Sequence, residues 1–292
     1  MKMEALYHCV GISRQGFHNY RTNQSEKAQK DDQIIQRVRY HRQTHQRMGA
    51  RPLFAMMHQQ EQGDQALVQQ FGRDKFEQIL LNNDLKVQKI RVFHKTTYSG
   101  AFRFPNLVEG LKINQLNRIW VSDITYYRLN QAWVYLTSIL ELYSRRLLGY
   151  AISQTLQTEH TTIPALEMAL KTRKIKGFNN QLIFHSDGGG QYYDAEFLKI
   201  LQQHSILSSM AEIVYENPHS ERFHGTAKND YLIPWKVNSF LQLKREFPRF
   251  AKLYNEIRPH QSLNYKTPFA FEKEIQLIPL CQRPWVLFKK IT

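Results

Sequence analysis

The chain has 292 residues, of which 42% are hydrophobic, and its 40 lysines and arginines against 25 aspartates and glutamates give a net charge of +15. This length and composition exclude wholesale disorder and indicate about two globular domains with a full core. The two cysteines, Cys9 and Cys281, exclude a disulfide scaffold, and in the absence of a long apolar run we expect neither a signal peptide nor a membrane span. The positive charge favours a polyanionic partner, nucleic acid above all, over a membrane surface.

The positive charge is concentrated at the two ends of the chain. Residues 1–100 carry a net charge of +7, residues 101–230 carry +1, and residues 231–292 carry +7. Solvated helices would account for either basic end, but solubility alone does not require charges of one sign. We therefore expect both ends to contact phosphates and the nearly neutral middle to carry chemistry that depends on acids.

Helices are predicted for the N-terminal part of the chain. Residues 5–20 indicate two short helices with a turn at Gly11 and Ser13, which is either a helix-turn-helix or an ordinary helical hairpin. Further helices are predicted within 25–49, 50–60 and 73–85, followed by an extended basic linker over 86–117.

Strand and helix signals alternate in the middle of the chain. Tryptophan, valine, isoleucine, threonine and tyrosine are enriched in three segments, which predicts antiparallel strands over 118–129, 132–142 and 145–153. The segments that follow predict a helix over 158–172, a strand at 182–184, a helix over 194–204, a strand near 206–207 and helix again from about 218. This order predicts an α/β fold with a single mixed central sheet.

Three acidic residues lie on separate predicted elements of this block. Asp123 lies in the first strand, Asp187 ends the short apolar strand before three glycines, and Glu221 lies in the first turns of the last helix. Each has an ordinary alternative: a solvent-facing strand residue, a residue of an Asp-Gly turn, and a favourable charge at a helix N-terminus. Lys228 follows Glu221 by two helical turns, which places a cation on the same helix face.

Three carboxylates from separate elements would suit a site for two Mg²⁺ ions, because this ion prefers oxygen ligands. Two such ions activate an attacking oxygen and stabilise a leaving oxygen at phosphorus. The 12 histidines show no paired zinc spacing, so we do not expect a zinc site.

Four motifs, in order, resemble a known family. The motif W-x-x-D-I-T-Y occupies residues 120–126, and H-S-D-x-G-x-Q-Y occupies residues 185–192. The pattern E-N-x-x-x-E-R-x-x-G-x-x-K occupies residues 216–228, and a tail signature that includes R-P-H-Q-S-L lies within residues 254–268. On these motifs the chain resembles the transposases encoded by the second reading frame (OrfB) of a large bacterial insertion-sequence family, whose DDE catalytic core is of the retroviral-integrase type.

The sequence departs from the family pattern at three points. The spacing from Asp187 to Glu221 is 34 positions, two fewer than the family spacing. Gly188 stands where the family usually has arginine, and Glu141 stands where it commonly has aspartate. All three acids and Lys228 are nevertheless present.

The resemblance implies an RNase H-like core, a mixed five-stranded sheet with helices on both faces, preceded by a small helical DNA-binding region and followed by a basic helical tail. The implied regions are a helix-turn-helix-like DNA-binding region at 1–60, a helical and basic linker at 61–117, the integrase catalytic core at 118–275 and a C-terminal tail at 276–292.

The resemblance also implies a reaction. Asp123, Asp187 and Glu221 would be the catalytic acids and the ligands of two Mg²⁺ ions, with Mn²⁺ as a substitute. Water would cleave a phosphodiester at an insertion-sequence end, and the 3′-OH released would attack a second phosphodiester in strand transfer. Lys228 would contact DNA near the scissile phosphate.

The implied partner is double-stranded DNA, both the terminal inverted repeats of the element and the target. We expect a homo-multimer, an upstream-frame fusion partner in some forms, no membrane partner, and a bacterial cytoplasmic location, at the nucleoid when DNA is bound. The side chains expected to contact DNA are Lys228, Arg222, Arg14, Arg37, Arg51, Arg258 and His260. Arg222 and His185 are expected either to contact a phosphate or to support the acids from a second layer of residues.

Two alternatives remain open from the sequence. A catalytically silent DNA-binding protein derived from a transposon would keep the basic ends without the chemistry. An RNase H-like nuclease that cuts without joining would keep the acids but have no evident use for the basic tail.

Overall fold

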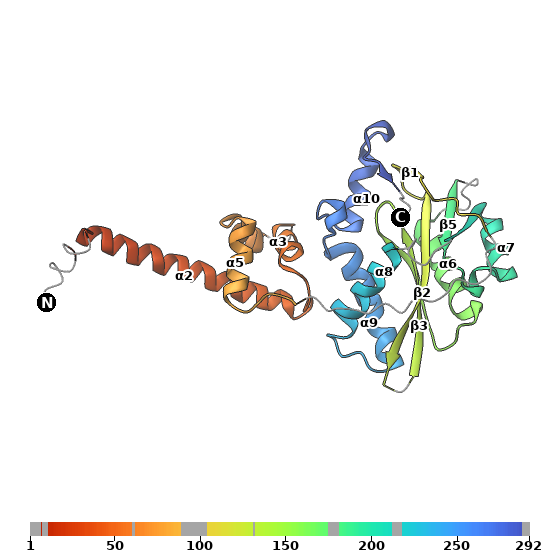
Figure 1. Ribbon diagram of the computed structural model, residues 1–292, viewed down its shortest axis with the longest axis horizontal. Coiled ribbons are helices and arrows are strands. Elements are labelled where there is room, and N and C mark those ends of the chain that lie inside the picture. Colours follow the sequence, from red (N-terminus) through yellow and green to blue (C-terminus); the bar gives the residue numbers. More distant parts are fainter. Residues whose placement is uncertain are drawn as a thin grey trace. The chain divides into compact units, whose positions relative to one another are not determined.

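The structure, a computed structural model, describes residues 7, 11–59, 62–88, 104–130, 132–174, 181–211 and 218–287. The chain divides into two compact units, residues 1–88 and residues 89–292 (Figure 1). No helix within the described ranges is long and apolar enough to cross a membrane. The boundary between the two units, after residue 88, lies within the linker expected at 61–117. The regions expected at 1–60, 61–117, 118–275 and 276–292 stay predictions.

A single long helix dominates the first unit. Helix α2 spans Arg14–Arg42 and begins at Ser13, whose side chain accepts a hydrogen bond from the backbone N–H of Gly16 at 2.9 Å. The prediction of a short second helix ending near residue 20 was wrong about its length, because no glycine or proline interrupts the chain between Gly16 and Gly49. The first predicted helix lies outside the described residues, except for Tyr7.

Three shorter helices pack on the C-terminal part of α2. They are α3 (Ala50–Gln59), α4 (Gln62–Gln69) and α5 (Arg73–Asn82). The shared core of this unit consists of large apolar side chains, among them Ile34, Val38, Leu53, Met57, Val68, Phe76 and Ile79. The N-terminal half of α2 contributes nothing to this core, and most of its side chains are exposed.

A buried acid holds α4 to α2. Asp64 accepts hydrogen bonds from Arg37 and from His41, the latter at 2.6 Å. Burial alone would raise the pKa of the Asp64 carboxyl, but the hydrogen bonds and charges of Arg37 and His41 outweigh burial and lower it. The carboxylate therefore stays charged and acts as a structural anchor.

The second unit is built on a five-stranded mixed sheet. Its strands are β2 (Ile119–Leu129), β3 (Ala132–Glu141), β4 (Leu147–Ser153), β5 (Leu182–Ser186) and β6 (Ile206–Met210). Their order is β4-β3-β2-β5-β6, with β2, β3 and β4 antiparallel and β5 and β6 parallel to β2. This confirms the predicted RNase H-like arrangement: an antiparallel meander extended by two strands that return through helices.

Helices cover both faces of this sheet (Figure 1). On one face lie α6 (Thr162–Arg173), preceded by η1 (Thr158–His160), and α7 (Ala195–Gln203), preceded by η2 (Gly190–Tyr192). On the other face lie α8 (Pro218–Gly225), the π-helical segment η4 (Thr226–Leu232), α9 (Phe240–Lys252) and the π-helical segment η5 (Leu253–Ile257). Trp120 of β2 packs in the first of these two cores and Val121 in the second, as the alternation of a strand requires.

Gly149 permits the closest contact between a helix and the sheet. A Cβ atom at this position of β4 would lie 2.0 Å from the backbone oxygen of Ala165 in α6. Any side chain here would push α6 away from the sheet, so glycine is required by the packing.

The C-terminal part returns to the beginning of the unit. After η6 (Gln261–Leu263) come α10 (Pro268–Leu277) and η7 (Leu280–Gln282). Strand β7 (Val286–Leu287) then pairs antiparallel with β1 (Lys112–Ile113), so the residues expected to form a separate tail are hydrogen-bonded to the segment that precedes the core.

The edge strand β6 is covered by the segment before β1. The backbone N–H of Leu107 donates to Ser209 Oγ at 2.9 Å. Covering of this kind protects the sheet edge from pairing with another chain.

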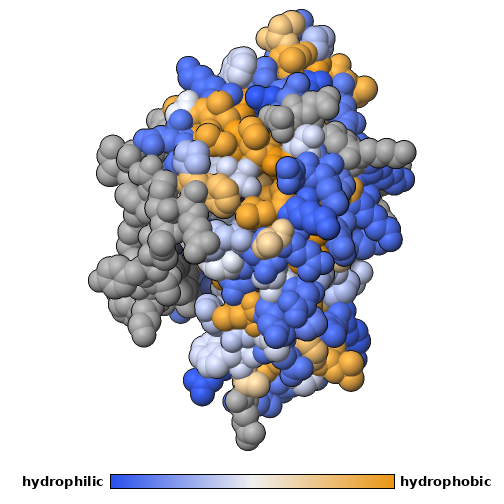
Figure 2. Space-filling view, turned by 90° about the vertical axis from the view of Figure 1, so that its right-hand side faces the viewer, coloured by the Kyte–Doolittle hydropathy of each residue, from blue (hydrophilic) through white to orange (hydrophobic). Residues whose placement is uncertain are grey.

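Figure 2 views the side on which α6 and α7 lie, where hydrophobic surface is interrupted by hydrophilic residues.

Candidate active site

Asp123 lies in the middle of β2, on the face covered by α8. Its side chain is 21% exposed, and its Oδ2 atom lies 3.5 Å from Nε2 of His224. Burial, together with the charges of Asp187 and Glu221, raises the pKa of the Asp123 carboxyl to about 8. A backbone hydrogen bond and the charge of Lys228 oppose this without outweighing it. Asp123 is therefore a carboxylate that lacks a sufficient counter-charge.

Asp187 directly follows β5, the strand that pairs in parallel with β2. Val121 is paired with His185, so Asp123 and Asp187 each lie two residues beyond one paired position on adjacent strands. The backbone N–H of Gly189 donates to Asp187 Oδ1 at 3.2 Å, but burial still raises the pKa of the Asp187 carboxyl. The two strands thus carry two poorly compensated acids to the same level of the sheet.

Glu221 lies in the first turn of α8, and its side chain is exposed. Its charge acts on Asp123, so the three predicted acids lie in one region of the structure. Among the described residues, however, no three histidine, cysteine, aspartate or glutamate side chains converge as a ready-made metal centre. The donor set itself fits Mg²⁺, since it consists of carboxylate oxygens whose mutual repulsion a divalent cation would relieve.

Two further residues of the same helical segment reach β2. His224 lies 3.1 Å from Ser138 Oγ on β3 through Nε2, and burial lowers the pKa of its ring to about 3, with Lys228 contributing in the same direction. Lys228 Nζ donates to Thr125 Oγ1 at 2.6 Å, and burial lowers the pKa of the Lys228 ammonium to about 8 although Asp123 opposes the shift. Lys228 was expected near the acids from the sequence.

His224 was not predicted, although a signal for it exists. It follows Glu221 by three residues and precedes Lys228 by four, so the three side chains share one helix face. The sequence-based prediction considered only the acid and the lysine of that face.

The expected DNA contacts fall into three groups. Arg222 is exposed on α8 beside Glu221, and Arg14 is exposed at the start of α2. Arg37 and Arg51 are held by acids of their own unit, Arg37 by Asp64 and Arg51 by Glu77 at 2.8 Å.

Arg258 and His260 are partly buried and make structural contacts. Arg258 pairs with Asp230 at 2.7 Å, and the His260 ring packs on Tyr254 with ring centroids 4.6 Å apart. Burial lowers the pKa of His260 to about 3, with Arg258 adding to the shift. Both side chains make structural contacts, and the expectation that they contact DNA stays a prediction.

His185 is fully buried in β5 and lies 3.0 Å from Ser209 Oγ of β6 through Nδ1. Burial lowers the pKa of its ring to about 4. Its position in the strand turns its side chain into the sheet core, which disfavours a direct phosphate contact, and the alternative role beside Asp187 stays a prediction.

Residues of the tail signature, within 254–268, pack against α8 and bond to β4. Tyr254 packs edge-on against Phe223 with centroids 4.9 Å apart. The Asn255 side chain bonds both the N–H and the C=O of Leu147 in β4, each at 2.9 Å. These contacts fix the helix that carries Glu221 to the sheet that carries Asp123.

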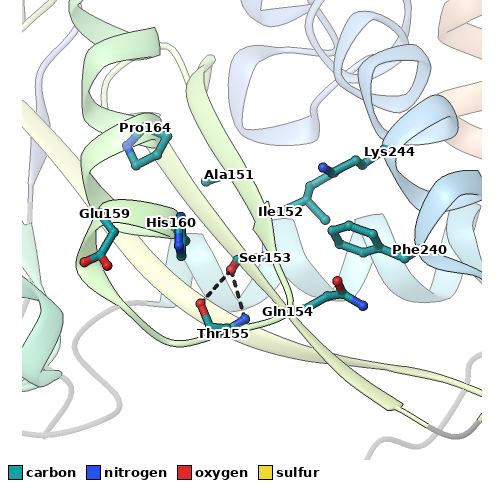
Figure 3. Close-up of a pocket in the computed structure, with 10 residues that line it drawn as sticks. All are labelled: Ala151, Ile152, Ser153, Gln154, Thr155, Glu159, His160, Pro164, Phe240 and Lys244. Atoms are coloured by element: carbon teal, nitrogen blue, oxygen red, sulfur yellow. Dashed lines mark hydrogen bonds between the residues drawn. The ribbon is translucent and has the colours of Figure 1, made fainter.

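A cavity of about 450 Å³ lies at the end of β4, between η1 and α9 (Figure 3). Ser153 and Thr155 line it from the strand side, and Phe240 and Lys244 line it from α9. None of the predicted site residues borders this cavity, so its size does not mark it as the catalytic site.

Known proteins are similar in sequence to this chain. Two family models described as "Integrase core domain" match residues 114–214 and 214–268. "Insertion element IS600 uncharacterized 31 kDa protein" of Shigella sonnei is 29% identical over 274 residues, which are 90% of this chain and 96% of that protein. "Transposase InsF for insertion sequence IS3fB" of Escherichia coli strain K12 is 36% identical over 166 residues, 54% of each chain. The chain belongs to the integrase-core transposases of insertion sequences.

Solved structures of integrases are also similar to this transposase. The HTLV-2 integrase catalytic core domain in complex with magnesium is 19% identical, covers 53% of this chain and 96% of its own, and has a TM-score of 0.42. The simian T-cell lymphotropic virus intasome, bound to a PP2A regulatory subunit, contains a chain that is 17% identical, covers 79% of this chain and 77% of its own, and has a TM-score of 0.47.

Proposed function

We propose that this transposase cleaves phosphodiester bonds at the ends of its insertion sequence and joins the resulting 3′-OH to target DNA, with Asp123, Asp187 and Glu221 as the catalytic acids. The observation that carries the proposal is electrostatic. Asp187 and Glu221 both raise the pKa of Asp123, although the three residues come from three separate elements. Acids gathered without sufficient counter-charge are typical of a site that binds cations.

The three carboxylates would hold two divalent ions, Mg²⁺ or its substitute Mn²⁺. Such ions, when bound, activate an attacking oxygen and stabilise a leaving oxygen at phosphorus. In the first reaction the oxygen of water attacks phosphorus, and the bond from phosphorus to the 3′ oxygen breaks. In the second, that 3′-OH attacks a target phosphodiester, forms a new ester bond and releases the target's own 3′ oxygen.

The chain's own residues position and balance the site. Lys228, now hydrogen-bonded to Thr125, would contact a DNA phosphate beside the scissile bond. His224, between Asp123 and Ser138, would orient the Asp123 carboxylate. The burial of Asp123 strengthens each of these electrostatic contacts by removing water.

The substrate would be double-stranded DNA, bound as inverted-repeat ends and as target. A homo-multimer would hold two ends together, and an upstream-frame fusion partner would add to end binding. The exposed N-terminal half of α2, with Arg14 at its start, would contact backbone phosphates without reading the sequence.

The test uses a labelled duplex copied from the DNA that flanks the gene, incubated with Mg²⁺. Wild-type protein should release 3′ ends and give joined products, and Glu221→Gln should give neither. Glu274→Gln, which removes an exposed acid of α10, serves as the matched control and should behave as wild type. Equal cleavage by Glu221→Gln would refute the assignment, and binding without cleavage by wild type would favour a silent DNA-binding protein.

A further inference from the structure

Basic side chains surround Tyr254 beside the proposed site. Tyr254 is buried, and its ring contacts Phe223 of α8 on one side and His260 on another. The next residue, Asn255, is hydrogen-bonded to Leu147, which places the turn between β3 and β4 against the same tyrosine. Arg145 belongs to that turn and Arg222 adjoins Phe223, and the charges of both arginines oppose the burial that raises the pKa of Tyr254.

Arg145 is partly buried, and one of its guanidinium nitrogens lacks a hydrogen-bond partner in the described part of the chain. It adopts a left-handed backbone conformation, with φ of 61°. Its Nη1 atom is buried and, within the described part of the chain, has no hydrogen-bond acceptor. A buried guanidinium nitrogen without an acceptor is costly and indicates a missing anion or an equivalent acceptor.

The neighbouring arginine shows the contrast. Arg146 donates to Glu272 at 2.6 Å, and Arg173 donates to the same carboxylate. The nearest acid to Arg145 along the chain, Glu141, instead accepts the N–H of Ser144 at 2.6 Å and that of Asn117 at 3.2 Å. Arg146 and Arg173 each keep a buried Nε atom without an acceptor but share an acid partner, whereas Arg145 has no acid partner in the described part of the chain.

The charges around Tyr254 act on one another. Burial lowers the pKa of Arg145 to about 10, with Tyr254 and Glu141 opposing the shift and Arg222 adding to it. Burial lowers the pKa of His219 to about 3, and Arg145 and Arg222 both add to that shift. These mutual effects agree with the contacts around Tyr254 and place Arg145, Arg222 and His219 within one electropositive region.

We propose that Arg145 and Arg222 together hold one backbone phosphate of the DNA strand that passes Glu221. The proposal rests on the proposed function, since it places that phosphate beside the catalytic acids. Arginine suits the task because its planar fork of N–H groups matches a phosphate, and one anion would satisfy both guanidinium groups. A phosphate bound here would fix the position of the strand relative to Asp123 and Glu221.

The test measures binding of a labelled duplex of arbitrary sequence in EDTA, so that it requires neither metal nor cleavage. Each phosphate neutralised contributes about 0.9 to the slope of log affinity against log salt concentration. Arg145→Gln and Arg222→Gln should each lower that slope by up to about one, and the double variant should lose no more than about one. Lys171→Gln removes an exposed charge from α6, on the other face of the sheet, and should leave the slope unchanged.

The double variant decides the proposal. A loss of about two would mean that the arginines hold separate phosphates, and no loss would mean that they hold none; either result overturns the proposal. Urea unfolding checks that Arg145→Gln is folded. If it is not, the exposed Arg222 carries the test: glutamine should lower the slope and lysine should restore it.

This outcome is separable from that of the proposed function. Altered slopes without Mg²⁺-dependent cleavage of the element-end duplex would support the phosphate site and refute the transposition chemistry. Unaltered slopes with normal cleavage would do the reverse.

Discussion

The second unit contains two groups of acids that differ in how they are compensated. Glu272 of α10 is 4% exposed and accepts hydrogen bonds from Ser144, Arg146 and Arg173 at 2.6–2.8 Å. Its partners outweigh the effect of burial and lower the pKa of its carboxyl. Asp123 is also substantially buried, but the nearby acids and burial raise its pKa to about 8.

The contrast separates a structural acid from one that we propose to be functional. Burial penalises every carboxylate, so the direction of the pKa depends on whether the fold supplies cations and donors. Around Glu272 the fold supplies them and joins α10 to α6 and to the turn after β3. Around Asp123 it supplies more carboxylates, which leaves the compensation to a ligand.

The largest effect should come from removing a functional acid. Asp123→Asn or Glu221→Gln should lower Mg²⁺-dependent cleavage by about 10³-fold or more, because a lost metal ligand removes several kcal/mol of transition-state stabilisation. Both variants should unfold in urea at no lower concentration than wild type. If either variant cleaved DNA within tenfold of the wild-type rate, the proposed catalytic role of that acid would be contradicted.

Breaking the structural group should instead destabilise the fold. Glu272→Ala leaves Arg146 and Arg173 without their shared acid and should cost about 3–5 kcal/mol in the free energy of unfolding, measured in urea. Glu274→Gln, on the same helix but exposed, should cost less than about 1 kcal/mol. Similar losses from the two variants would show that the Glu272 network contributes little.

Most of the sheet and both of its helical faces follow from the sequence, since β-branched and aromatic runs and apolar helical spacing suffice to predict them. The positions of Asp123, Asp187 and Glu221 on separate elements were also predictable. The continuous length of α2 was missed because residues 5–20 were interpreted as two short helices of similar length, joined by a turn at Gly11 and Ser13.

Other features could not be predicted because they depend on pairings between distant residues. The compensation of Glu272 requires Arg173, 99 positions away, and the anchoring of Leu147 requires Asn255, 108 positions away. Arg258 and His260 carry basic side chains in a basic tail, yet tertiary packing pairs Arg258 with Asp230 and sets His260 against Tyr254. The net charge of a region predicts the kind of partner that it binds, but it does not show which side chains contact that partner.

Lys228 sharpens the comparison because its charge acts on Asp123, one of the proposed catalytic acids. Lys228→Gln should lower cleavage about 10- to 100-fold, the effect of losing one charged hydrogen bond to the substrate. It should also reduce the salt dependence of duplex binding by about one phosphate. Unchanged cleavage would mean that Lys228 serves only to hold Thr125.

A smaller effect concerns stability and pH in EDTA. The folded chain raises the pKa of Asp123 from 3.8 to about 8, so between these pH values the folded state retains a proton that the unfolded state has lost. Stability should therefore fall as pH rises from about 4 to 8. Asp123→Asn should remove that part of the fall and raise the melting temperature at pH 8, by roughly 2–4 °C for each kcal/mol gained. A wild-type melting temperature that is independent of pH would contradict the raised pKa.

The most direct measurement is a calorimetric titration of Mn²⁺ into wild type, Asp123→Asn and Glu274→Gln without DNA. The account predicts saturable binding to wild type and to Glu274→Gln, and binding that is lost or strongly weakened in Asp123→Asn. Equal binding to all three proteins would place the metal elsewhere and contradict the assignment of Asp123, Asp187 and Glu221.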